Sequence, residues 1–252
     1  MSAARAPQDR SVESPASTLA RRCAALMDAD MRVAYVRHAL REMAPEEMVA
    51  LVAELLRRRT PAHADALLTV SLALGSAEVD AARTAAARRA AKDGLPDVVA
   101  LLGSHEDATP ELGELRVPDF GRGRPLTLGE RKTLARRRDR QLLGRVLRDP
   151  HPDVIQVLLG NPALTEEDVV RLAATRPIDP RSLEAIYQRP RWAVRYRVRR
   201  ALVQNPYCPL PVALRLVHHL TAPDARRLAN APDLRAPIRE ACARAAHAAP
   251  EH

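Results

Sequence analysis

Apolar residues recur along most of the chain at intervals of three and four, the spacing of one face of an α-helix. Val33, Val36, Leu40 and Met43 follow this spacing, and comparable stripes continue as far as Leu102. Nine Gly and few β-branched runs leave little room for a sheet. The pattern therefore predicts an all-α protein whose residues 17–102 form an N-terminal helical bundle.

In the second half, most breaks between apolar stripes contain Pro, for example Asn161-Pro162 and Asn205-Pro206. The residue before Pro is biased out of the α region, and Asn can adopt the left-handed conformation that ends a helix. Thr127 and Thr165 begin segments of capping-box form. These signals predict helices at 128–137, 140–148, 152–160, 165–175, 180–188, 191–204, 209–220, 222–230 and 235–246.

The two Asn-Pro elements belong to a repeat with a period of 44 positions. Val154, Leu158 and Leu159 precede the first Asn as Val198, Leu202 and Val203 precede the second, and apolar positions after each element also match. A fixed period with matched apolar positions is typical of stacked helical repeats. We therefore expect residues 127–247 to form a helical-repeat domain.

Two segments lack helical periodicity. Residues 1–16 are polar and are expected to form a disordered arm. Residues 103–126 gather Pro, Gly and Arg, which is typical of a linker or a functional loop. Its only Phe, Phe120, can dock a linker on a neighbouring helix; alternatively the flexible segment around Arg122 and Arg124 can act as a binding loop.

The segment from Val198 to Pro209 resembles the repeat of the leucine-rich repeat variant family and, more loosely, HEAT repeats. The resemblance covers residues 150–246. It implies a right-handed α-solenoid of short antiparallel helices. Members of that family can carry an N-terminal cysteine cluster for an iron–sulfur centre, but only Cys23 lies near this N-terminus, so no cofactor is expected.

All but two of the 40 basic residues are Arg, and the formal net charge is +9. This bias can reflect coding composition or selection for contacts with carboxylates and phosphates, which the planar guanidinium binds well. The charge comes in blocks. Residues 121–148 hold 10 basic and 2 acidic residues, 149–188 hold 3 and 7, and 189–223 hold 7 and none.

Candidate binding residues lie in the two basic blocks. On one helix, Arg191, Arg195 and Arg199 would share a side, with Trp192 beside them. This row is either a solvated face with a packed Trp or an anion-binding ridge whose Trp stacks on a ligand. The complete candidate set is Arg122, Arg124, Arg131, Arg191, Trp192, Arg195 and Arg199.

Candidate chemistry is sparse. The adjacent residues of Ser104-His105-Glu106-Asp107 cannot converge on one substrate atom, and no histidines are spaced for a metal site. Three scattered cysteines, no signal peptide and no long apolar stretch favour a cytoplasmic protein without membrane segments.

Two functional interpretations remain. The first is a non-catalytic scaffold that binds another protein. The alternative is nucleic-acid binding, similar to the HEAT-like alkylpurine DNA glycosylases, with Asp179 or Glu184 as a nearby acid.

Overall fold

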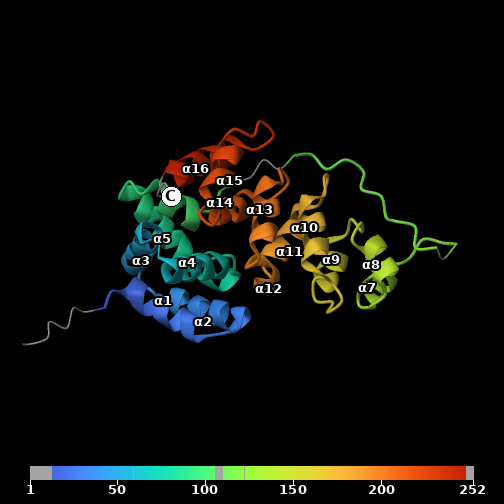
Figure 1. Cartoon of the computed structure of the whole chain (residues 1–252), viewed down its shortest axis with the longest axis horizontal. Coiled ribbons are helices and arrows are strands. Elements are labelled where there is room, and N and C mark those ends of the chain that lie inside the picture. The colour runs from blue at the N-terminus through green and yellow to red at the C-terminus, as the bar shows by residue number, and fades with distance from the viewer. Residues whose placement is uncertain (1–12, 59, 106–109, 122, 248–252) are drawn as a thin grey trace, which may run out of the picture.

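The computed structural model describes residues 13–58, 60–105, 110–121 and 123–247. Within these ranges the chain forms sixteen α-helices and one short 3₁₀ helix, and no strand occurs there (Figure 1). The all-α prediction is confirmed.

The first six α-helices form the N-terminal part of the molecule. Four of them begin at a Pro, and in α1 and α4 the residue before this Pro caps the helix with its side chain. Thr60, for example, accepts a hydrogen bond from the amide of His63 before Pro61 opens its helix. The elements are α1 Pro15–Ala25, α2 Ala29–Arg41, α3 Pro45–Arg57, α4 Pro61–Ala73, η1 Ala77–Val79, α5 Asp80–Lys92 and α6 Pro96–Leu102.

Helix α1 begins inside the segment expected to be a disordered arm. Ser14 accepts a hydrogen bond from the amide of Ser17, and Ala16, Leu19 and Ala20 are buried against the other N-terminal helices. The prediction of disorder is therefore wrong for residues 13–16, and residues 1–12 lie outside the described ranges. The small apolar face of α1 gave too weak a signal in a polar stretch.

The connection between the two halves contains no helix in its described residues, 103–105, 110–121 and 123–127. Figure 1 shows it running to the end of the molecule where α7 and α8 lie. Phe120 is only 8% exposed and belongs to the core of the C-terminal helices. The segment is thus anchored by its Phe, as the linker interpretation expected.

Ten helices follow, and their positions agree closely with those predicted from the sequence. Both predicted capping boxes, at Thr127 and Thr165, are present. One prediction, a single helix over 191–204, is wrong. The helices are α7 Leu128–Ala135, α8 Arg140–Val146, α9 Pro152–Leu158, α10 Glu166–Ala174, α11 Pro180–Tyr187, α12 Pro190–Ala193, α13 Tyr196–Gln204, α14 Leu210–Val217, α15 Ala222–Ala229 and α16 Ala236–His247.

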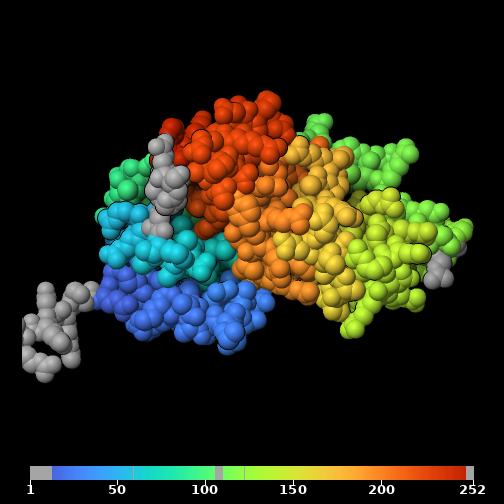
Figure 2. All heavy atoms as spheres, viewed as in Figure 1, coloured from blue at the N-terminus to red at the C-terminus, as the bar shows by residue number. Residues whose placement is uncertain are grey.

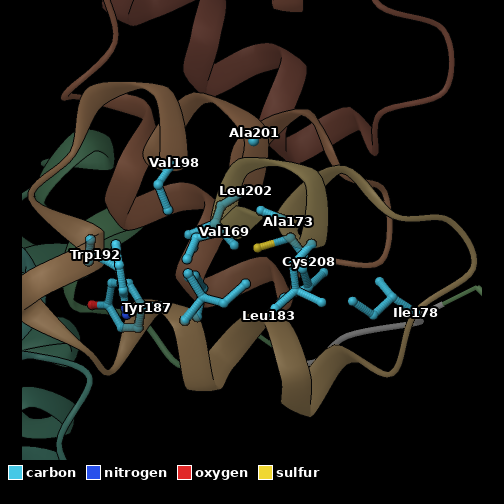
Figure 3. Close-up of a cluster of buried hydrophobic side chains, with 14 of the residues drawn as sticks. Val169, Ala173, Ile178, Leu183, Tyr187, Trp192, Val198, Ala201, Leu202 and Cys208 are labelled. Carbon is cyan, nitrogen blue, oxygen red and sulfur yellow. The ribbon is translucent and has the colours of Figure 1, made fainter. Parts of the chain in front are cut away.

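The apolar positions matched at a spacing of 44 are buried in both copies. Val154 and Val198 are fully buried, as are Leu158 and Leu202. Figure 3 shows Val198 and Leu202 pointing into one cluster with side chains of α10 and α11. The repeat seen in the sequence therefore records a shared packing face.

The two repeat asparagines make the same hydrogen bonds. The Asn161 amide donates to the carbonyls of Ala135 and Arg137, both at 2.8 Å, and its oxygen accepts from the amide of Ala163. The Asn205 amide likewise donates to the carbonyls of Ala173 and Thr175, at 2.8 and 2.9 Å, and accepts from the amide of Tyr207. We call this arrangement the asparagine clamp.

The expectation that these asparagines adopt a left-handed conformation is wrong. No described residue other than Gly has a positive φ, and Asn205 is extended, with φ −89° and ψ 118°. Asn161 and Asn205 are 3% and 0% exposed. A buried amide satisfies carbonyls that the end of a preceding helix leaves without partners, so Asn is needed here for its side chain.

The N-terminal and C-terminal helices meet where α14 packs on α6 and α4 and where α12 packs on α2, and Tyr187 of α11 also reaches across. The hydroxyl of Tyr187 donates to the carbonyl of Ser71, and Arg215 donates to the carbonyl of Leu101 at 3.1 Å. A Cβ at Gly75 would lie 2.4 Å from the Tyr187 ring, so only Gly permits this approach. These contacts join α11 and α14 to the N-terminal helices.

Candidate interaction surface

The predicted row of arginines does not lie on one helix. Helix α12 ends at Ala193 and α13 begins at Tyr196, so Arg191 belongs to α12 and Arg199 to α13. Arg195 lies between them as the residue that precedes α13. The prediction of a continuous ridge is therefore wrong.

Trp192 is a packing residue. It is 2% exposed, and its indole nitrogen donates to the carbonyl of Leu159 at 2.9 Å. The exposed Arg191 guanidinium stacks over the indole, 4.5 Å from the ring centroid. With its edge hydrogen-bonded and its surface covered, Trp192 cannot stack on a base.

Arg199 and Arg195 serve the structure. The Arg199 guanidinium donates to the carbonyls of Ala193 and Val194, at 3.3 and 2.5 Å, and so closes the end of α12. Burial lowers the pKa of this guanidinium. Arg195 pairs with Glu166 at 3.1 Å.

Two further candidates, Arg124 and Arg131, are also paired with carboxylates. Arg122 lies outside the described residues. Arg124 pairs with Glu130, and its hydrogen bonds, followed by those of Thr127, lower the pKa of Glu130 to about 2. Arg131 is buried and donates to both carboxylate oxygens of Asp149, at 2.7 and 2.9 Å. Among the described members of the candidate set, Arg191 alone is exposed without a carboxylate partner.

The acidic block is neutralised by the basic blocks on either side of it. From the first block, Arg140 donates to Asp168 at 2.6 and 2.8 Å, and its hydrogen bonds hold the pKa of that carboxyl far below its usual range. From the second block, Arg197 donates to Glu167 at 2.7 Å. The alternation of charge along the sequence is therefore a pattern of ion pairs that join α10 to α8 and to α13.

Among the arginines outside these pairs, one group of five lies within residues 136–148. It lies on the turn between α7 and α8, on the last turn of α8 and just after the end of α8. All its members are exposed, and none has a carboxylate within ion-pair distance among the described residues. Figures 1 and 2 show α7 and α8 forming one end of the molecule. We call this group the arginine end: Arg136, Arg137, Arg138, Arg145 and Arg148.

The arginine end was visible in the sequence as part of the basic block 121–148, but its members were not singled out. The run Arg136-Arg137-Arg138 follows the last apolar residue of a helix, where arginines are exposed and favoured by the helix dipole. The spacing of a long helix drew attention to Arg191, Arg195 and Arg199 instead.

A Ser–His contact lies between the two cores. The Ser71 hydroxyl and the His219 Nε2 are 2.8 Å apart. Ser71 is fully buried, so its hydroxyl has no room to attack a substrate. Within the described ranges, no three His, Cys, Asp or Glu side chains are grouped as metal ligands. Cys23, Cys208 and Cys242 are free and buried.

His219 makes the contact between the cores sensitive to pH. Burial, followed by the charges of Arg199 and His218, lowers the pKa of His219 well below its usual value of 6.5. As the pH falls below 6.5, the unfolded chain binds the proton while the folded chain does not, so stability present above pH 6.5 is lost.

We expect the urea midpoint of the wild-type protein to fall between about pH 7.5 and about pH 5.5, and His219→Gln to flatten this dependence, because one linked proton changes stability by at most about 1.4 kcal/mol per pH unit. His38→Gln, at an exposed histidine, is the matched control and should leave the dependence unchanged. An unaltered slope in the His219 variant would refute this role.

Comparison with protein-family models, with curated proteins and with solved structures finds no match to this chain. The resemblance to leucine-rich repeat variants and HEAT repeats remains a prediction. None of the helices in the described ranges is long and apolar enough to cross a bilayer.

Proposed function

We propose that this protein is a non-catalytic helical-repeat scaffold that binds an acidic partner protein through the arginine end. Residues 127–247 are proposed to form a right-handed α-solenoid. Helix α7 packs on α9, α9 packs on α11, and α10 packs on α13, so alternate helices are neighbours, as in stacked helix pairs. The asparagine clamps recur at the period of such a stack.

The arginine end is the observation that carries this proposal. Elsewhere in the repeat helices, carboxylates neutralise many of the arginines: Arg140, Arg195 and Arg197 are all paired with α10. Five exposed guanidiniums within thirteen residues repel one another unless an anion approaches. A surface with this excess favours a partner of opposite charge and speeds its association.

The burial of the large aromatic side chains favours a protein partner over a nucleic acid. Binding of single-stranded nucleic acid normally uses exposed aromatic rings on which bases stack. Trp192 and Phe120 are both buried. Asp179, suggested as a nearby acid by the glycosylase resemblance, caps α11 and pairs with Arg181. The arginine end then supplies charge without a stacking platform.

Titration with polyglutamate and with duplex DNA tests this function. We expect polyglutamate binding at about 150 mM salt, and DNA binding that is confined to about 50 mM salt, because phosphate-only contacts weaken steeply with salt. Replacing all five arginines of the arginine end with Gln should abolish polyglutamate binding. DNA binding that persists at the higher salt and exceeds polyglutamate binding would favour the nucleic-acid alternative.

A matched control removes the same number of positive charges from elsewhere on the protein surface. It replaces five exposed arginines outside this surface: Arg41, Arg88, Arg171, Arg226 and Arg227. This variant should bind polyglutamate like the wild type. Equal loss in both variants would show that net charge, and not the arginine end, governs binding.

A further inference from the structure

A cleft of about 430 Å³ lies beside the arginine end. Its lining comes from three places in the fold. Arg136 follows α7, Gln156 and Gly160 lie at the end of α9, and Arg189 precedes α12. Segments 53 positions apart in the sequence thus contribute one arginine each to the same hollow.

Both arginines of the cleft have free hydrogen-bonding capacity. Arg136 donates one hydrogen bond, to the carbonyl of Lys132 at 3.3 Å. Arg189 is exposed, and it has no carboxylate partner in the described part of the chain. No acidic side chain lines the cleft. Two guanidiniums that share a hollow without a counter-charge are suited to bind an anion between them.

Part of the cleft lining is held in place by hydrogen bonds within the protein. Asn161 lines the cleft, and its side-chain amide donates to the carbonyls of Ala135 and Arg137. Val157 and Pro162 add apolar surface, and Gln156 is exposed and offers an amide. A rigid, partly apolar site with a few convergent polar groups is the usual form of a recognition pocket.

We propose that this cleft binds a glutamate or aspartate side chain from an extended acidic segment of the partner, with Arg136 and Arg189 donating to its carboxylate. The inference rests on the proposed function and adds the position and chemistry of recognition. A side chain protruding from a peptide can enter a hollow of this volume.

The test is fluorescence anisotropy with a short labelled Glu-rich peptide and its Gln isostere. Arg136→Gln/Arg189→Gln should weaken binding of the Glu-rich peptide at least about tenfold, because two charge-assisted hydrogen bonds are lost. The matched control Arg145→Gln/Arg148→Gln removes two charges from the arginine end outside the cleft and should weaken binding by less than about threefold. Thermal melts establish that both variants are folded.

Three results would contradict the proposal that this cleft binds an acidic side chain. Equal weakening by the two double variants would mean that charge alone binds the peptide, which leaves the proposed function intact. Equal binding of the Gln isostere would exclude recognition of a carboxylate. A wild-type protein that binds polyglutamate but not the short peptide would require a more extended surface than this one hollow.

Discussion

Asp149→Asn should lower the free energy of unfolding by about 3–5 kcal/mol, because it leaves the buried Arg131 guanidinium without its counter-charge. The Asp149 side chain is fully buried and that of Arg131 is 10% exposed, so water cannot replace the lost carboxylate. Asp149 also accepts a hydrogen bond from the amide of His151, which precedes α9. Urea denaturation followed by circular dichroism measures the effect.

Asp233→Asn is the matched control for that prediction. Asp233 pairs with Arg176 at 2.7 Å, but both side chains are more than 40% exposed. Its replacement should cost less than about 1 kcal/mol. A similarly small loss for Asp149→Asn would mean that the ion pair between α7 and the residue before α9 contributes little to the stability of the fold.

Asn205→Ala should lower the free energy of unfolding by about 3 kcal/mol, because it leaves the carbonyls of Ala173 and Thr175 without a hydrogen-bond donor. Asn161→Ala should have a comparable effect, since Asn161 makes the same three hydrogen bonds one repeat earlier. Equilibrium denaturation of the two variants provides the comparison.

Asn230→Ala is the control for the clamp. Asn230 follows the end of α15, where it is exposed, and its amide donates only to the carbonyl of Arg226 in that helix. We expect a change within about 0.5 kcal/mol. If Asn205→Ala lowered the free energy of unfolding equally little, the hydrogen bonds from Asn205 to Ala173 and Thr175 would contribute little to stability.

The helices of the second half could be predicted because residues close in sequence determine where each helix begins and ends. Pro follows most breaks, and Thr127 and Thr165 open helices by capping bonds within four residues. The break between α12 and α13 had no such signal. It is stabilised by side-chain hydrogen bonds: Trp192 donates to Leu159, 33 positions away, and the Arg199 side chain closes the end of α12.

The candidate site was predicted less well because ion pairs join residues that are far apart in sequence. Counting charges located the basic and acidic blocks, but the partners of Arg131 and Arg140 lie 18 and 28 positions away. A count of charges alone therefore does not show that much of this charge is paired between helices. The same limit applies to Asn161, whose carbonyl partners lie 24 and 26 positions before it.

Site-specific photo-crosslinking in the native host tests most directly whether the arginine end is the binding surface. A photoreactive amino acid replaces Arg138 in one variant and Arg41 in another. Both positions are exposed, but Arg41 lies at the end of α2 and pairs with Glu42. We predict nuclease-resistant protein adducts at position 138 that an excess of Glu-rich peptide suppresses, and none at position 41. Equal adducts at the two positions, or adducts at 138 that nuclease removes, would contradict the account.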